Sequence, residues 1–266
     1  MEGKNITIEW RRGVGTQEET RLQAIDLVAS KVDLIVSFGS PATRAALDTG
    51  ATPVVFLVGD PVGAGFAVSL ARPGGKGTGV STQTTELNRK RLEILRQLSP
   101  RAQRFLYLGN YSNPIAARDL AEMEKGARAL GIKLVSLSAQ NSAEIEVELQ
   151  AIRQRSGDAV VVSADTTLLV NKAKIASAIR EAKLPAIFPF REYHEVGALM
   201  SYSPNMDETM YRLATYVDRI LRGANPAEQP IEQISTYELI IDLRIAREMR
   251  IPVPQELLLR ANDVIR

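Results

Sequence analysis

Residues 33–58 have the sequence DLIVSFGSPATRAALDTGATPVVFLV, in which two apolar runs flank a helical segment. The runs 33–38 and 53–58 are almost continuously apolar, as is typical of β-strands that are covered on both faces. Between them, Pro41 suits the first turn of a helix that we expect to reach Thr49. The order strand, helix, strand predicts a parallel βαβ unit.

The alternation continues along the rest of the chain. A strand is also predicted at 6–10, where apolar and polar residues alternate. Further strands are predicted at 104–108, 132–137, 159–163, 185–188 and 198–202, helices at 84–98, 113–130, 142–155, 168–183 and 206–222, and an extended segment at 231–241. The sequence therefore predicts an α/β fold built on parallel sheets.

The sequence ARPGGKGTG at residues 71–79 is the strongest break in this pattern, with four glycines and a proline in nine residues. Such a stretch suits a boundary between lobes. We expect two doubly wound parallel-sheet lobes. Because ligands of open parallel sheets bind beyond the carboxyl ends of the strands, two such lobes would form a ligand cleft.

Composition excludes several classes of function. The chain has 266 residues and a formal charge of +2, from 33 basic and 31 acidic residues, which argues against a nucleic-acid partner. It has no cysteine and one histidine, His194, so we expect no metal and no cofactor. The sequence contains no run of about 18 apolar residues, so it predicts no membrane span. The residues after Met1 have no apolar segment of the kind a signal peptide carries.

The loops after the predicted strands supply the candidate binding residues. After residue 38 come Ser40, Pro41 and Ala42, where Ser40 is expected to be the N-cap and the free amides behind it could hold a carboxylate. Ordinary helix capping is the alternative. Asn110 lies in a second polar loop, after residue 108, and the same alternative applies to it.

Three acids also follow predicted strands. They are Asp60, Asp165 and Glu192, each of which is either a turn or cap residue or a partner for an ammonium or hydroxyl group of a ligand. Phe190 and Tyr193, beside Glu192, could form an apolar wall.

Enzyme motifs are incomplete. GAGFAV at 63–68 lacks the third glycine of a dinucleotide fingerprint, GKG at 75–77 lacks the rest of a phosphate-binding loop, and no G-x-S-x-G occurs. His194 with Glu192 and Glu195 makes a poor metal site. No catalytic set is assembled, which favours binding over catalysis.

Several short stretches, spread over the whole chain, occur in the order in which one family carries them. They resemble the solute-binding proteins of ABC importers, in the group that includes tryptophan- and tyrosine-type binding proteins. The stretches are EGKNI at 2–6, VGDPV at 58–62, SLARPGG at 69–75 with TG at 78–79, KRLE at 90–93, NP at 113–114, LPAI at 184–187, FRE at 190–192, LMSY at 199–202, ATYVD at 214–218 and ANDVI at 261–265.

The resemblance implies a type I periplasmic-binding-protein fold whose chain crosses a hinge three times, at the stretch ending with 78–80, at 198–204 and at 231–238. It places 1–79 and 204–230 in the N-terminal lobe, and 80–203 and 231–266 in the C-terminal lobe. It implies capture of a small molecule between the lobes and delivery to a membrane permease, in the periplasm or another extracytoplasmic space.

The resemblance also implies which loops face the ligand. The matching positions are Ser40, Asp60, Asn110, Asp165 and the loop Phe190-Arg191-Glu192. For an amino acid ligand, Ser40 and the amides behind it would hold the carboxylate, and an acid would face the ammonium group. Family members carry a signal peptide and a first strand–helix unit before EGKN, so we expect that the sequence comes from a truncated gene model and that its N-terminal lobe is incomplete.

Two other functions stay open at this point. One is the ligand-sensing domain of a lac-repressor-type regulator, which has the same fold but follows a helix-turn-helix segment. The other is a small-molecule α/β enzyme that uses Asp165 or Glu192 with His194.

Overall fold

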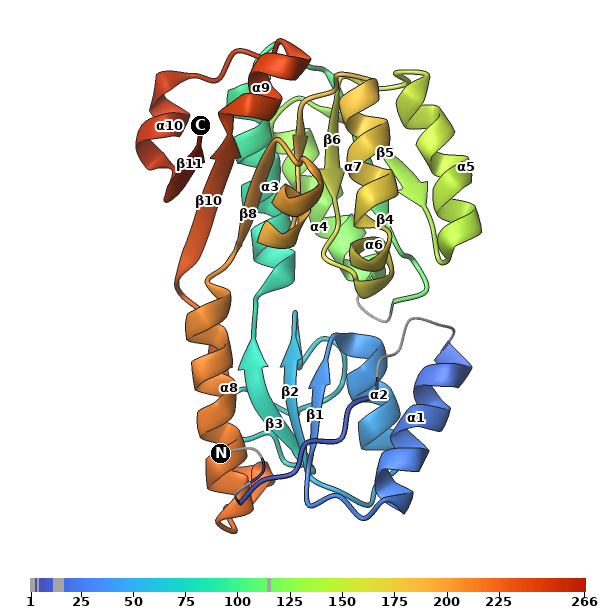
Figure 1. The fold of residues 1–266 in the computed structure, drawn as a ribbon, viewed down its shortest axis with the longest axis vertical. Coiled ribbons are helices and arrows are strands. Elements are labelled where there is room, and N and C mark those ends of the chain that lie inside the picture. The colour runs from blue at the N-terminus through green and yellow to red at the C-terminus, as the bar shows by residue number, and fades with distance from the viewer. Residues whose placement is uncertain (1–2, 4, 12–16, 114–115) are drawn as a thin grey trace. The chain divides into compact units, whose positions relative to one another are not determined.

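The computed structural model describes residues 3, 5–11, 17–113 and 116–266. The chain forms two compact units, and it passes from one to the other three times (Figure 1). The first unit contains Met1–Ser81 and Met210–Glu232, and the second contains Thr82–Thr209 and Gln233–Arg266. Each unit has a four-stranded sheet, and helices connect most of its strands, although β2 leads to β3 without a helix.

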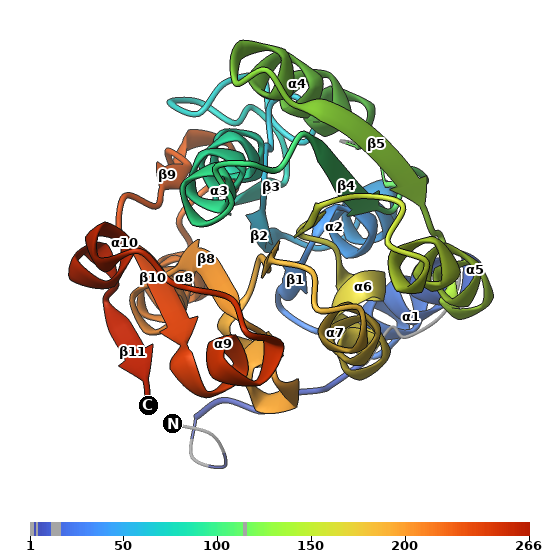
Figure 2. The same cartoon turned by 90° about the horizontal axis from the view of Figure 1, so that it is seen from above.

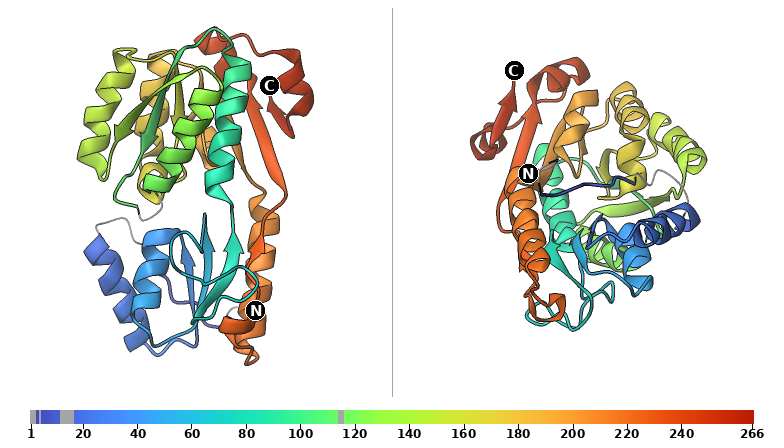
Figure 3. Two further views of the ribbon diagram at one scale, coloured as in Figure 1. Left: turned by 180° about the vertical axis from the view of Figure 1, so that it is seen from behind. Right: turned by 60° about the horizontal axis from the view of Figure 1, so that its bottom comes forward.

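In the first unit the sheet has the strand order β1-β2-β3-β9, and β1, β2 and β3 are parallel. Helices α1 and α2 pack together beside β1 and β2, and the end of α8 lies near β3 (Figure 3). The bounds are β1 Ile35–Phe38, β2 Val54–Val58, β3 Gly77–Ser81, β9 Glu232–Gln233, α1 Gln17–Ala29, α2 Ser40–Asp48, α8 Met206–Leu221 and the short helix η2 Pro226–Glu228. The apolar runs at 33–38 and 53–58 thus form neighbouring parallel strands, as predicted. The expectation that both are covered on both faces holds for β2 but is wrong for β1, in which every second residue is exposed.

The glycine-rich stretch does more than break the chain, because its last residues form the buried strand β3. Gly79 has φ +148°, and a Cβ atom on it would lie 2.1 Å from the carbonyl oxygen of Phe56 in β2. Only glycine fits this close backbone approach. The glycines that make the sequence look like a loop therefore permit a strand.

The prediction of a strand at 6–10 is wrong. Residues 7–10 belong to no strand, and Ile6, Ile8 and Trp10 are exposed. Alternation specifies a strand only where another strand offers backbone partners. Among the described residues, β1 pairs with β2 alone, and Val36 and Phe38 of β1 are exposed as well.

In the second unit a parallel sheet has the order β5-β4-β6-β7. Its strands are β4 Arg104–Gly109, β5 Lys133–Ser138, β6 Ala159–Val162 and β7 Ala186–Ile187. The central strands β4 and β6 are almost wholly buried. Leu108 is in register with Val162, so the two central strands end level and their following loops are neighbours.

Helices cover both faces of this sheet (Figure 2). Phe105 and Tyr107 of β4 face a core shared with α3 and α4, whereas Leu106 and Leu108 face a core shared with α5, α6 and α7. The helices are α3 Thr84–Leu98, α4 Ala116–Ala129, α5 Ser142–Arg153, α6 Thr166–Val170 and α7 Lys172–Glu181. The helix predicted at 168–183 is thus two helices that meet at Asn171. Pro114, the expected first-turn residue of α4, lies outside the described residues.

A smaller sheet completes the second unit. Strand β10 pairs antiparallel with β8 and parallel with β11, and a bridge from Phe188 to Ser201 joins the end of β7 to β8. The elements are η1 Arg191–Val196, β8 Met200–Pro204, β10 Tyr237–Asp242, α9 Leu243–Met249, α10 Gln255–Arg260 and β11 Asp263–Ile265. The sequence predicts extended segments here, but it does not predict the antiparallel pair. In the part of the chain described, no helix combines the length and apolarity that a bilayer span requires.

Candidate functional site

The loops after β4 and β6 bring Asn110 and Asp165 together. The Asn110 Nδ2 atom lies 3.3 Å from each carboxylate oxygen of Asp165, and Asn113 Nδ2 lies 3.1 Å from Oδ2. Asn110 and Asp165 are both buried, and Asp165 is only 4% exposed. This proximity follows from the topology, since β4 and β6 are adjacent and end level.

Backbone groups hold both side chains in place. Asp165 is the N-cap of α6, and its Oδ1 accepts from the amides of Thr167 at 2.8 Å and Leu168 at 3.3 Å. The Asn110 Oδ1 accepts from the amide and the hydroxyl of Ser112 at 3.1 and 2.7 Å. With its carbonyl thus occupied, the Asn110 amide directs its N–H groups at Asp165.

A small hollow opens beside this pair, with room for about one water-sized group. Two of its ten lining residues are acids and none is basic. The residues are Tyr107, Gly109, Asn110, Tyr111, Asn113, Ala116, Asp119, Ser163, Ala164 and Asp165. The hollow therefore favours a positively charged or hydrogen-donating group.

Asp119 and Arg91 are buried side chains that the sequence analysis does not identify. Burial lowers the pKa of Arg91 to about 10, and the charge of Asp119 is among the influences that oppose this shift. The guanidinium therefore stays protonated at neutral pH. Helical periodicity could have found Asp119, because Ala116, Asp119 and Met123 follow the spacing of one buried helix face.

Tyr107 lies between Arg91 and the hollow. Burial raises the pKa of its hydroxyl far above the ordinary value, and the nearby carboxylate of Asp119 raises it further. Tyr107 therefore stays protonated and keeps its O–H as a hydrogen-bond donor.

The predicted loop Phe190-Arg191-Glu192 leads into η1. Phe190 packs on the apolar core beside α7, and Arg191 Nη1 lies 3.6 Å from Glu238 Oε2 on β10. A buried Oε2 oxygen of Glu192 accepts no hydrogen bond from the described residues. The three side chains thus face different surroundings, and only Glu192 presents an unused acceptor.

Tyr193 lies close to the two acids of this region. Its ring contacts that of Phe188 in a tilted arrangement with 4.7 Å between centroids, and its buried hydroxyl has no hydrogen-bond partner in the described chain. Burial raises its pKa well above the usual value, and the charges of Asp165 and Glu192 raise it further. Tyr193 therefore adds a phenol oxygen near Asp165.

In the first unit, Ser40, Pro41 and Ala42 form the first turn of α2. Ser40 is buried, but the prediction that it is the N-cap is wrong. Gly39 is the cap, with φ +80°, and its carbonyl accepts from the amide and the hydroxyl of Thr43 at 3.1 and 2.9 Å. The glycine conformation starts the helix one residue earlier, so no side chain is required to cap it.

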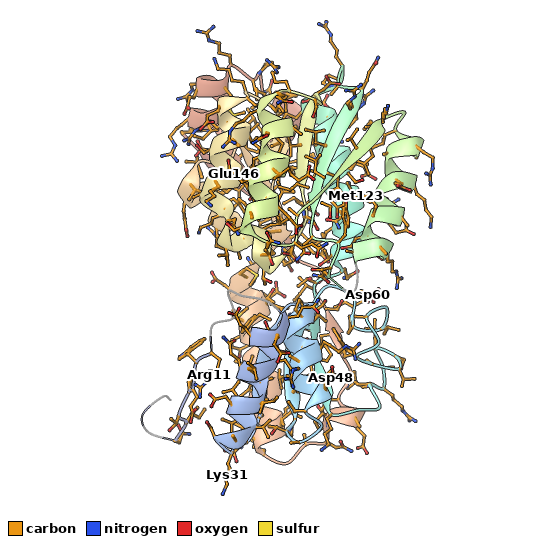
Figure 4. The ribbon with its side chains drawn as sticks, turned by 90° about the vertical axis from the view of Figure 1, so that its right-hand side faces the viewer. Arg11, Lys31, Asp48, Asp60, Met123 and Glu146 are labelled. Atoms are coloured by element: carbon orange, nitrogen blue, oxygen red, sulfur yellow. The ribbon has the colours of Figure 1, made fainter. Side chains whose placement is uncertain are left out.

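Asp60 follows β2 in the first unit and is half-buried (Figure 4). Its Oδ1 accepts from the amide of Gly63, three residues further on, at 2.9 Å. The turn function expected as the alternative for this acid is therefore present.

His194 has a structural environment. Its Nε2 lies 2.9 Å from the hydroxyl of Ser201, and burial lowers its pKa to about 4, so the ring is neutral at pH 7. Within the described ranges, no three acid, histidine or cysteine side chains come together as metal ligands would.

Comparison with known proteins assigns the chain to a family. Residues 1–265 match the family described as ABC transporter substrate binding protein. The chain belongs to the ABC transporter substrate-binding protein family. The resemblance seen in the sequence is thereby confirmed, and so is the capture of a small molecule for transport as the general function.

Three relatives illustrate the range of this substrate-binding family. The tyrosine-binding protein of Clostridioides difficile strain R20291 is 25% identical over 245 residues, which cover 91% of this chain and 70% of that protein. A conserved domain protein of Vibrio cholerae superposes with a TM-score of 0.92 at 26% identity, covering 99% of this chain and 88% of the other. A domain from Streptococcus pneumonia, solved in complex with L-Trp, superposes with a TM-score of 0.86 at 26% identity, covering 94% of this chain and 86% of the other.

The substrate-binding protein has the type I periplasmic-binding-protein fold, as expected from the resemblance. The family consists of extracytoplasmic binding proteins.

Proposed function

We propose that this substrate-binding protein captures an amino acid with an aromatic side chain and that Asp165 receives its ammonium group. The observation that carries the proposal is the buried carboxylate of Asp165 at a hollow whose lining contains no basic residue. A buried charge needs a compensating partner, and Arg91, which is buried in the same unit, donates to three uncharged oxygens rather than to Asp165. A ligand cation would fill this role.

The acceptors around Asp165 fit an ammonium group. Such a group has three N–H donors, and it is about the size of a water molecule. The carboxylate of Asp165 lines the hollow, and two further buried oxygens of the second unit, on Glu192 and Tyr193, lie outside its lining and have no partner among the described residues. The amides of Asn110 and Asn113 hold the Asp165 carboxylate in place for it.

The aromatic class is supported by the relatives and by the lining of the hollow. One relative is named for tyrosine and another was solved with L-Trp. Tyr111, which lines the hollow, offers a half-buried ring for contact with an aromatic side chain. Because the family serves ABC transporters, we also propose that an ABC permease receives the bound amino acid.

Calorimetric titration tests the proposed substrate class. We expect saturable binding of L-tryptophan or L-tyrosine, and a loss of at least about 100-fold in affinity for indole-3-propionate, which lacks the ammonium group. Tryptamine, which keeps the ammonium group, separates the contribution of the ligand carboxylate. Binding of sugars in place of amino acids would overturn the proposal, and so would equal binding of L-tryptophan and indole-3-propionate.

Asp165→Asn tests the residue. The substitution keeps the shape and an oxygen for capping, but it removes the charge, so we expect about 100-fold weaker binding. The matched control is Asp158→Asn, because Asp158 also accepts from two backbone amides, at 2.8 Å each, outside the hollow. Asp158→Asn should leave affinity unchanged. Unaltered binding by Asp165→Asn would refute the assignment of this carboxylate.

A further inference from the structure

We infer that Arg91 is a positioning residue for the ligand hollow: through Asn88 it fixes the direction of a hydrogen-bond chain that ends at Tyr107. The inference rests on the proposed function, because it concerns how the same hollow is prepared for its ligand. It assigns a role to a side chain that does not line the hollow itself.

Arg91 lies on the buried face of α3 and is only 1% exposed. Each of its three nitrogen atoms donates to an uncharged oxygen: Nε to the Tyr202 carbonyl at 2.9 Å, Nη1 to the Asn88 side-chain carbonyl at 2.8 Å, and Nη2 to the Pro189 carbonyl at 3.3 Å. Arginine has donors and no acceptor, so the direction of all three bonds is certain.

The bond to Asn88 orients the next link. Asn88 is fully buried, and since its carbonyl oxygen accepts from Arg91, its amide nitrogen faces the Tyr107 hydroxyl at 3.4 Å. The Tyr107 oxygen then accepts from Asn88, and its own proton cannot point back along the chain. Tyr107 also has a side-chain hydrogen bond with Ser163, and both residues line the hollow, so the Tyr107 O–H is directed toward Ser163 on the hollow side.

The other two bonds extend the effect to the chain around the hollow. Pro189 immediately precedes the loop of Phe190 and Glu192, and Tyr202 lies in β8. One guanidinium therefore fixes a lining side chain and the start of the Glu192 loop. A lysine has one nitrogen at the end of a flexible stem and cannot span three such separate acceptors in a fixed geometry.

The decisive variant is Asn88→Asp. A carboxylate at this position still accepts from Arg91, but it also accepts from Tyr107, so the Tyr107 proton turns away from the hollow. Stability should be kept, because the new charge faces a guanidinium. We expect affinity for L-tryptophan or L-tyrosine, whichever the wild type binds, to fall about tenfold without a lower melting temperature.

Gln97→Glu is the matched control. It makes the same change from amide to carboxylate beside an arginine, since Arg260 Nη1 donates to Gln97 Oε1 at 2.7 Å, and neither residue lines the hollow. Its affinity should equal that of the wild type.

Tyr107→Phe gives an independent reading, because it removes the same proton without adding a charge. We expect about a tenfold loss, and the double variant Asn88→Asp, Tyr107→Phe should lose no more than either single variant. Arg91→Lys should fold but should not restore wild-type affinity.

The results with these variants distinguish a failure of the proposed function from a failure of the inference about Arg91. If the wild type binds no amino acid, the proposed function fails, and the inference about Arg91 fails with it. If the wild type binds and either Asn88→Asp or Tyr107→Phe binds equally well, only the inference is overturned. Additive losses in the double variant would also overturn it, because the two residues would then act separately.

Discussion

The two units use the same strand–loop–helix plan but differ in what their loops deliver. In the second unit, the loops after the adjacent strands β4 and β6 bring Asn110 and Asp165 within hydrogen-bond distance. In the first unit, β1 and β2 are also adjacent and parallel, but the Asp60 carboxylate accepts from Gly63 within its own turn.

The difference follows from where the strands lie in each sheet. Strands β4 and β6 are central, so neighbours on both edges and helices on both faces fix where they end. In the first unit only β2 is central and buried, whereas its neighbour β1 is at an edge and exposes Val36 and Phe38. Two neighbouring strand-end loops are therefore brought together best where both strands are enclosed. Three measurements test this contrast between an enclosed unit and an open one.

Gly79→Ala should have the largest effect and should act on the first unit. The added Cβ would collide with the Phe56 backbone at 2.1 Å and force β3 away from β2. We expect a loss of about 3 kcal/mol or more in the free energy of unfolding, measured by urea titration.

The control is Gly131→Ala in the second unit, where φ is +65° but no atom lies within 4 Å of the new Cβ. It should cost about 1 kcal/mol, the conformational penalty alone. Equal costs for the two variants would show that the β2–β3 approach is not what holds the first sheet together.

The pH dependence of stability should reveal the enclosed interior of the second unit. Burial lowers the pKa of His194 to about 4 in the folded state, whereas the unfolded chain has about 6.5. The unfolded state thus binds the proton first as pH falls, so stability is lost between pH 6.5 and 4 and is constant above this range.

We expect about 2 kcal/mol less stability at pH 5 than at pH 7.5 from this group. Since His194 is the only histidine, His194→Gln should remove this part of the pH dependence while leaving that of the carboxylates. An unchanged profile in His194→Gln would mean that the ring is solvated in the folded protein.

The smallest effect is expected on the open side of the first unit. Leu22 on α1 is 52% exposed, so Leu22→Lys should change the free energy of unfolding by no more than about 0.5 kcal/mol. Val147→Lys on α5, where the side chain is 65% exposed, is the matching change in the second unit. A loss above about 1 kcal/mol for Leu22→Lys alone would show that this face is covered in solution.

Continuous apolar runs made most of the fold predictable. The runs at 53–58 and 159–163 had to be covered strands, and the helix predicted at 84–98 has the bounds of α3. The pattern of apolar residues did not predict the places where the backbone conformation of a single glycine decides the structure. Gly79 makes β3 possible, and Gly39 rather than Ser40 caps α2.

Part of the candidate site was also predictable. Asn110 and Asp165 follow predicted strands, and adjacency of those strands in the sheet brings them together. Arg91, Asn88 and Tyr107 were not identified as site residues. The partner of a polar residue on an otherwise apolar face is known only once the packing of its helix or strand is known. The ligand-binding assignments themselves all stay predictions: Ser40, Pro41, Ala42, Asp60, Asn110, Asp165, Phe190, Arg191 and Glu192.

The three passages of the chain between the units have a consequence for biosynthesis. The first sheet closes with β9, which the ribosome makes only after residues 82–209 have been synthesised. The second unit likewise waits for β10 and β11, which follow the third passage between the units. Neither unit can complete its sheets early in translation, so the nascent polypeptide carries open strand edges until these strands have been made.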